Sequence, residues 1–339
     1  MKTEVNMDKK KYIASYFEKT KHILEHEKPN NIIKLQFFQR KDNAILAGMN
    51  EVLALLEEVT DTSKYVIRYL PEGSKINNLE IVLELEGNYQ DFGMWEGMID
   101  GILARSTSIA SNAYACVQAA KGKPIIFMGD RADHYINQEI DGKAIALAGV
   151  KLVSTEAQKQ NQNKDEITFG SVPHVLIQGF GGDITAAMLA YSKHFPNNKL
   201  IALVDYHNDV IKESLKVWDA LGDKVWGVRL DTSKNMVDHM FDNEEPHYGV
   251  NIEQVKRLRK ALDQAGATNY KIVVSSGFDA QKIKDFEDNN APVDYYGVGQ
   301  SIFKLSNSFS ADATMLNNQK EAKEGRSYRE NGKLVVYKK

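Results

Sequence analysis

The chain has 339 residues, of which 42% are hydrophobic and 26% are charged, and its net charge at pH 7 is -3. These values exclude an intrinsically disordered chain and provide no overall positive field that would attract nucleic acid or an anionic membrane. The single cysteine excludes an intramolecular disulfide, and no apolar run approaches the roughly 20 residues of a membrane span. We therefore expect a cytoplasmic protein with a small-molecule partner, without nucleic acid or a membrane as partner.

The first 120 residues predict an N-terminal α+β domain. The expected elements are an amphipathic helix over 8–27, a strand over 32–38, a helix over 43–58 and strands over 65–70 and 79–87. Residues 88–120 have a helical pattern, although the hydroxyl residues Thr107, Ser108 and Ser111 disfavour a continuous helix. The polar segment 317–339 predicts an extension that can return one strand to this domain, so 306–339 is grouped with it.

Between residues 121 and 305, short apolar strands alternate with helices. The expected strands are 124–129, 151–155, 199–205, 225–231, 271–277 and 294–299, and the expected helices are 136–149, 183–195, 208–221, 251–265 and 279–289. Such alternation is typical of parallel strands. Because no dinucleotide-binding fingerprint accompanies these strands, the pattern favours an α/β barrel over an open sheet.

Charged, hydroxyl and glycine residues lie at the C-terminal ends of these strands. They are Asp130 and Arg131, Ser154 and Thr155, Asp205, Arg229 and Asp231, Ser275 to Gly277, and Gly297 to Gly299. In α/β barrels the catalytic groups lie at the C-terminal ends of the strands. A single loop residue of this kind is more often merely exposed. The occurrence of many such residues together at the C-terminal rim of the barrel indicates a functional site.

The residue types at this rim predict a phosphorylated sugar as substrate. Turns such as SSGFD (275–279) and GVGQS (297–301) present backbone N–H groups to a phosphate. Arginines supply fixed positive charge for phosphate or carboxylate. Asp205 and Asp231 suit ribose hydroxyls, magnesium, or positive charge that develops on a sugar carbon. His174, at the expected start of a short helix, is on general grounds more often structural than catalytic.

The ordered motifs resemble those of the nicotinate phosphoribosyltransferases, in particular the shorter archaeal and bacterial type, from about residue 12 to about residue 305. In chain order the matching segments are LPEG (70–73), EGNYQDFGMWEGMIDGILARSTSIAS (86–111), FMGDR (127–131), GSVPH (170–174), LVDYHND (203–209), GVRLDTS (227–233), VVSSGFD (273–279) and YGVGQSI (296–302). The resemblance implies a type II phosphoribosyltransferase, with an N-terminal α+β domain over 1–120 and an irregular α/β barrel over 121–305. It also implies a homodimer with each site at a subunit boundary.

The implied reaction joins nicotinate to the ribose 5-phosphate of 5-phosphoribosyl 1-pyrophosphate (PRPP), giving nicotinate mononucleotide and pyrophosphate in NAD salvage. The family uses Mg²⁺, and some members couple the reaction to ATP hydrolysis. The implied site residues are Arg131 and Arg229 for PRPP or the pyridine carboxylate, Asp205 and Asp231 for the ribose and metal region, and Ser275, Gly277, Gly297 and Gly299 for the 5-phosphate. Tyr16 of a neighbouring subunit would stack on the pyridine, and Arg105 would reach PRPP from a loop. His174 would be the histidine that ATP phosphorylates.

Some positions depart from the family pattern. Met128 stands where the family has the aromatic residue of Phe-Gly-x-Arg, with Phe127 one position earlier, and Ser276 stands at a glycine position of SGGLD. The turn after LDT carries Ser-Lys-Asn in place of arginines. Two alternatives stay open. One is a quinolinate phosphoribosyltransferase, which needs a more basic pocket for two carboxylates, and the other is a divergent member that binds phosphoribosyl compounds with little turnover.

Overall fold

The computed structural model describes residues 8–160 and 167–338, and its contacts divide the chain into two compact units. The first unit comprises Met1–Ser111 and Leu305–Lys339, and the second comprises Asn112–Lys304. The boundary between them falls within one long helix, α4 (Glu96–Ala119). None of the helices in the described ranges is both long enough and apolar enough to cross a membrane.

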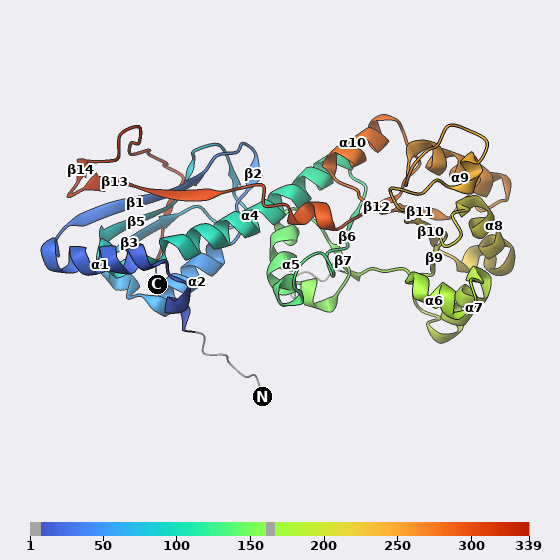
Figure 1. The fold of residues 1–339 in the computed structure, drawn as a ribbon, viewed down its shortest axis with the longest axis horizontal. Helices are drawn as coiled ribbons and strands as arrows, with labels where there is room; N and C mark the ends of the chain where they lie inside the picture. The colour runs from blue at the N-terminus through green and yellow to red at the C-terminus, as the bar shows by residue number, and fades with distance from the viewer. Residues whose placement is uncertain (1–7, 161–166, 339) are drawn as a thin grey trace. The chain divides into compact units, whose positions relative to one another are not determined.

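The first unit is built on an antiparallel sheet with the strand order β14-β13-β1-β5-β3-β15 (Figure 1). Its strands are β1 (Ile32–Gln39), β3 (Val66–Tyr69), β5 (Ile81–Asn88), β13 (Phe309–Leu316), β14 (Gln319–Lys320) and β15 (Val335–Val336), with a separate pair β2 (Ala44–Ile45) and β4 (Lys75–Ile76). Its helices are η1 (Lys9–Tyr12), α1 (Ser15–Glu27), α2 (Met49–Val59), η2 (Thr62–Lys64), α3 (Tyr89–Phe92), η3 (Gly93–Trp95) and the first part of α4. Strand β13, which the sequence analysis did not predict, pairs with β1.

The two faces of this sheet differ because side chains alternate along each strand. Leu35 and Phe37 of β1 are buried in a core that also contains residues of α2 and α4, which lie on one face of the sheet (Figure 1). Helix α2 begins beside Glu72, whose carboxylate accepts the N–H groups of Gly48 at 2.7 Å and Asn50 at 2.8 Å. That contact satisfies backbone donors which a helix start otherwise leaves without partners.

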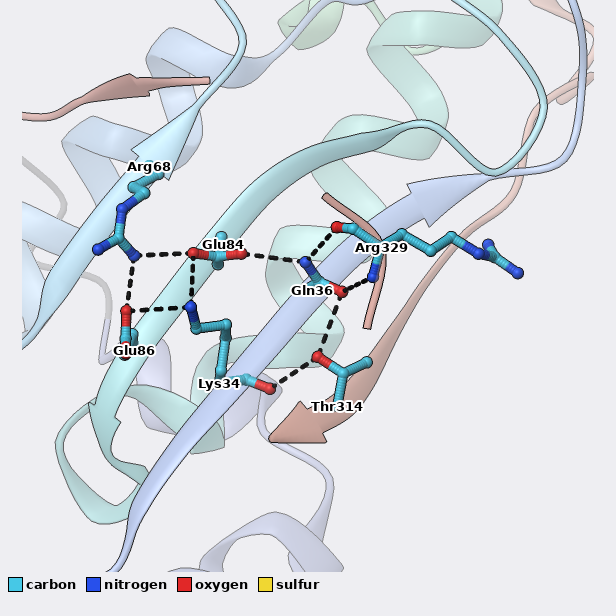
Figure 2. Close-up of polar contacts among 7 residues, drawn as sticks. All are labelled: Lys34, Gln36, Arg68, Glu84, Glu86, Thr314 and Arg329. Carbon is cyan, nitrogen blue, oxygen red and sulfur yellow. Dashed lines mark hydrogen bonds and ion pairs between the residues drawn. The ribbon is translucent and has the colours of Figure 1, made fainter. Parts of the chain in front are cut away.

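The other face carries charged and polar side chains that bind one another (Figure 2). The carboxylate of Glu84 accepts from Arg68 Nη1 at 2.7 Å and from Gln36 Nε2 at 3.0 Å, and Lys34 Nζ lies 3.4 Å away. Gln36 also donates to the carbonyl of Arg329 and accepts its N–H. The C-terminal segment therefore binds this polar face directly, and Glu84 is almost fully buried.

Replacing Glu84 with alanine is expected to lower the free energy of unfolding by about 2–4 kcal/mol, because Gln36 and the two neighbouring cations would lose a buried acceptor. Urea-induced unfolding measures this change. The control is Lys333→Met, which removes an exposed ion pair with Glu80 and should cost less than about 1 kcal/mol. Equal losses in the two variants would show that this network does not stabilise the sheet.

Helix α4 is continuous through Thr107, Ser108 and Ser111, although these residue types disfavour a continuous helix. All three hydroxyls bind backbone outside the helix: Thr107 Oγ1 accepts the N–H of Ala47 at 3.1 Å, Ser111 Oγ accepts that of Ile45 at 2.9 Å, and Ser108 Oγ accepts those of Ser306 and Asn307. The hydroxyl of Ser108 donates to a carbonyl one turn earlier in the helix itself. Thr107 and Ser111 therefore satisfy their hydroxyls outside the helix, and the bond from Ser108 to the Ala104 carbonyl is an i−4 contact that a helix tolerates at a small cost.

The second unit contains a parallel sheet that curves as a half-barrel, with the strand order β8-β7-β6-β12-β11-β10-β9 (Figure 1). Its strands are β6 (Ile125–Phe127), β7 (Leu152–Val153), β8 (Ile167–Thr168), β9 (Ile201–Leu203), β10 (Gly227–Leu230), β11 (Lys271–Val274) and β12 (Tyr295–Val298). Its helices are η4 (Tyr135–Asn137), α5 (Gln138–Leu147), η5 (Glu156–Gln158), α6 (His174–Gly179), α7 (Ile184–His194), α8 (Val210–Leu221), η6 (Gly222–Lys224), η7 (His239–Phe241), α9 (Ile252–Gln264), α10 (Ala280–Asp288) and η8 (Gln300–Phe303). The predicted irregular α/β barrel with parallel strands is confirmed, and β8 is an additional short strand.

Side chains connect the two edges of this sheet, where strands β8 and β9 do not pair with each other in the described part of the chain. Phe169, directly after β8, stacks on the ring of Tyr295 at a centroid distance of 5.6 Å and packs edge-on against Trp226. The ammonium of Lys199, close before β9, lies 4.9 Å from the Trp226 ring and 5.9 Å from that of Phe169. Aromatic packing and cation–π contacts therefore link edges that lack a backbone ladder.

Candidate functional site

A pocket of about 1080 Å³ lies in the second unit, at the C-terminal ends of several strands of the parallel sheet. Most of the predicted site residues line it, namely Arg131, His174, Arg229, Asp231, Ser275, Gly277, Gly297 and Gly299. They meet there because the carboxyl ends of parallel strands share one edge of the sheet. The pocket is large enough for a small-molecule ligand.

Arg229, on β10, is held by three side chains. Its Nε donates to Ser275 Oγ at 3.1 Å, its Nη1 to Ser171 Oγ at 2.7 Å and its Nη2 to Asp231 Oδ2 at 2.9 Å. Ser275 Oγ also donates to Asp231 Oδ1 at 2.6 Å, so the hydroxyl and the carboxylate are fixed together. Because these contacts set the guanidinium plane in advance, Arg229 can meet an anionic ligand without reorganisation.

His174 is the first residue of α6, and its Nε2 lies 3.2 Å from both carboxylate oxygens of Asp205. Asp205 follows β9 and is nearly buried; burial raises the pKa of its carboxyl group, and the neighbouring imidazole opposes that shift. His174 itself is half exposed and lines the pocket. When Nε2 donates its proton to Asp205, the ring nitrogen Nδ1 is free to act as a nucleophile. Asp205 thus orients His174 and is not itself a lining residue.

Glycine is required at these pocket positions for two different physical reasons. A Cβ atom at Gly299 would lie 2.5 Å from the carbonyl oxygen of Met128, and one at Gly297 would lie 2.7 Å from the Met128 thioether. These two positions therefore accommodate the end of β6, which packs over them. Gly277 has a φ of 73° and no atom within 4 Å of a Cβ placed there, so it faces open space. Gly277 is accordingly the position where a ligand can approach the backbone closely.

Phe303, which the sequence analysis missed, is one of two phenylalanines that line the pocket, the other being Phe278. Phe127 is fully buried and does not line the pocket, but its ring stacks on that of Phe303 at 5.7 Å with an interplanar angle of 27°. Both rings lie over Gly129, where a Cβ atom would overlap them. Met128 also lines the pocket, so both a thioether side chain and a phenyl ring contribute apolar lining.

Two predicted residues belong to the first unit. Tyr16 is exposed on α1, and Arg105 is partly buried within α4. The prediction that Arg105 lies in a loop is wrong, because α4 continues through it. Their roles stay predictions.

No group of three or more His, Cys, Asp or Glu side chains within residues 8–160 and 167–338 is arranged to hold a metal ion. The lining carboxylates are those of Asp231 and Asp279. Mg²⁺ is usually bound by one or two carboxylates together with substrate phosphates and water. The donor set therefore fits a magnesium ion that arrives with a phosphorylated substrate.

Comparison with known proteins adds independent observations. The family model for the quinolinate phosphoribosyl transferase N-terminal domain matches residues 15–107. A nicotinate phosphoribosyltransferase of Mycobacterium tuberculosis is 26% identical over 237 residues, which cover 68% of this chain and 47% of that protein. The nicotinate phosphoribosyltransferase of Bacillus subtilis is 23% identical over 239 residues, covering 69% and 44%. The chain spans about half the length of these relatives.

Solved structures share the fold. Nicotinate-nucleotide pyrophosphorylase from Pyrococcus furiosus superposes with a TM-score of 0.83 at 29% identity, covering 99% of this chain and 86% of that one. Human nicotinic acid phosphoribosyltransferase superposes with a TM-score of 0.70 at 17% identity, covering 91% and 75%. At that identity the human protein shows likeness in fold alone.

Proposed function

Because this chain belongs to the type II phosphoribosyltransferases, we propose that it transfers the phosphoribosyl group of PRPP to nicotinate, forming nicotinate mononucleotide and pyrophosphate for NAD biosynthesis. One observation carries the proposal: the pocket joins a pre-oriented arginine, Arg229, to an open glycine turn at Gly277. Relatives named nicotinate phosphoribosyltransferase support nicotinate as the acceptor.

In this reaction the anomeric carbon becomes positively charged as pyrophosphate leaves and the pyridine nitrogen approaches from the opposite face. The chain needs to move few protons, so it acts mainly through orientation and fixed charge. Asp231 would stabilise the positive charge on the sugar, while Arg229 would bind an anionic group of PRPP. Asp231 would also hold Mg²⁺ together with the substrate. When bound, Mg²⁺ neutralises charge on the departing pyrophosphate.

The pyridine ring would pack on the apolar side chains of Phe303 and Met128, with its carboxylate toward Arg131. All three residues line the pocket, and an aromatic face beside a cation suits a planar carboxylate. In the homodimer that we propose, Tyr16 of the neighbouring subunit would cover the other face of the ring. His174 would accept a phosphoryl group from ATP if the reaction is coupled to ATP hydrolysis.

The second candidate is transfer to quinolinate, which the family model matching residues 15–107 favours. Quinolinate brings two ring carboxylates and would need additional cations. The pocket is lined by the cations of Arg131, Arg229 and Lys304, and two carboxylates, including that of Asp231, offset part of their charge. This balance fits one pyridine carboxylate and the phosphates of PRPP better than it fits a doubly charged pyridine.

The test is a product assay with PRPP and Mg²⁺, using nicotinate, nicotinamide or quinolinate in turn, with and without ATP. Of the three acceptors, we expect only nicotinate to give a product, nicotinate mononucleotide, identified by mass spectrometry. Product only from quinolinate, with release of carbon dioxide, would establish the second candidate. PRPP binding without product from any acceptor would identify a phosphoribosyl-binding protein of low activity.

A further inference from the structure

The turn that faces the pocket between β11 and α10 contains two consecutive residues with left-handed backbone. Ser276 has a φ of 71° and Gly277 a φ of 73°. Glycine adopts this conformation freely, whereas a serine adopts it at a cost in free energy. A strained residue persists where the surrounding structure holds it in place. The groups that hold Ser276 in this conformation therefore also set the backbone geometry of the pocket.

Lys282, which lies near the start of α10, contacts the backbone of the preceding Ser276–Gly277 turn. Its Nζ donates to the carbonyl oxygen of Ser276 at 3.5 Å and lies 4.3 Å from the ring centroid of Phe278 and 5.9 Å from that of Phe286. Burial lowers the pKa of the Lys282 ammonium below its usual value. Within the described part of the chain this ammonium forms no ion pair at salt-bridge distance, and the nearby Asp279 carboxylate accepts the Lys282 backbone N–H at 2.9 Å.

The other hydrogen bonds of the turn involve Phe278 and Asp279, which follow the Ser276–Gly277 peptide. Ser301 Oγ donates to the carbonyl of Phe278 at 2.8 Å, and Asp279 caps α10. In a planar trans peptide the carbonyl and the following N–H point in opposite directions. The bond from Lys282 to the Ser276 carbonyl therefore turns the N–H of Gly277 to the side away from Lys282. At Gly277 the backbone lines the pocket and faces open space.

We propose that Lys282 is a positioning residue for the phosphate of the phosphoribosyl substrate: its ammonium fixes the peptide between Ser276 and Gly277, so that the Gly277 N–H is presented to the phosphate. The ammonium also places a positive charge behind the turn, which attracts an anion through a medium of lower dielectric constant than water. This inference rests on the proposed function for the phosphoribosyl group and is independent of which pyridine is the acceptor.

A purely structural lysine would behave differently. The ammonium of Lys282 lies over two phenylalanine rings, and a methionine of similar length can contact the same rings with its thioether. If packing were its whole role, Lys282→Met would leave ligand binding unchanged. If Lys282 positions the turn, the same variant should lose phosphate affinity while its thermal unfolding midpoint stays the same or rises, because a partly buried charge has been removed.

The experiment measures the dissociation constant for ribose 5-phosphate by calorimetry, together with the KM values for PRPP and for nicotinate. Lys282→Met is expected to weaken ribose 5-phosphate binding and to raise the KM for PRPP by at least about tenfold, with the KM for nicotinate changed less than about twofold. The matched control is Lys284→Met, which removes an equal charge from an exposed lysine of the same helix that pairs with Asp288. Equal ribose 5-phosphate affinities in the two variants would overturn the proposal.

A second variant tests whether Lys282 acts through the Ser276 carbonyl. Ser276→Gly removes the cost of positive φ, so Ser276→Gly with Lys282→Met should recover part of the lost ribose 5-phosphate affinity. No recovery in a folded double variant would contradict positioning through the Ser276 carbonyl. These binding measurements contain no pyridine. A wild-type protein that binds ribose 5-phosphate without converting nicotinate would therefore refute the proposed acceptor and leave the role of Lys282 intact.

Discussion

Replacing Arg229 with methionine is expected to weaken PRPP binding about 100-fold, which corresponds to about 2.7 kcal/mol. The variant removes a cation that three side chains hold in place, and it leaves the carboxylate of Asp231 without its arginine partner. An unpaired carboxylate would then repel the phosphates of PRPP within the pocket. Isothermal titration calorimetry with PRPP and Mg²⁺, without nicotinate, measures the effect.

Two further variants separate this effect from a general loss of positive charge. Arg257→Met removes a partly exposed arginine that pairs with Glu244 and Glu253 outside the pocket, and PRPP binding should be unchanged. In a titration without Mg²⁺, Arg229→Met combined with Asp231→Asn should bind PRPP better than Arg229→Met alone, because the repelling carboxylate is gone. Affinity within threefold of the wild type for Arg229→Met would show that the anion binds elsewhere.

Replacing His174 with alanine is expected to abolish phosphorylation by ATP and to leave a slow transfer that ATP does not stimulate. The physical reason is that phosphorylation of His174 would raise the affinity for PRPP, and ATP can stimulate the transfer only through that change in affinity. A variant that cannot be phosphorylated therefore loses the stimulation. Incubation with γ-labelled ATP, followed by analysis of acid-labile and base-stable phosphate, detects the modified imidazole. Asp205→Asn should retain the label but acquire it more slowly, since Asp205 orients the ring.

The control is His239→Ala, which removes an exposed histidine that pairs with Asp242 outside the pocket and should leave labelling unchanged. Absence of label in the wild-type protein would refute phosphorylation of His174. A structural histidine would give yet another result: the alanine variant would lose stability, and any stimulation by ATP would persist.

The sequence was most informative where burial is continuous along a segment. Strands β9 to β11 are short and largely apolar, and each precedes an α-helix with a regular apolar stripe, so their type and order were predictable. β8 consists of two exposed residues, Ile167 and Thr168, and has no apolar run to detect. β13 was missed because its partner β1 lies far away in the chain, and pairing at that distance leaves no local signal.

Site residues were likewise predictable only where the local sequence carries the signal. Residues at or near the C-terminal ends of the strands, such as Arg229 and Gly277, were predictable because parallel strands end at one edge of the sheet. Phe303 was not predictable, since its position depends on stacking against Phe127 over a residue that lacks a side chain. Lys282 was also missed, because a lysine on a helix gives no sign in the sequence that its ammonium returns to the preceding turn.

The pairing of β1 with β13 also bears on how the chain folds during synthesis. Lys34 and Thr314, which meet across these strands, are 280 residues apart. At typical translation rates of about 5–20 residues per second, roughly 14–56 s separate the synthesis of the two strands. The second unit is complete in sequence during that interval and can fold first, while one edge of β1 has no partner strand. Unpaired edges promote aggregation, so the nascent chain is most vulnerable before β13 emerges from the ribosome.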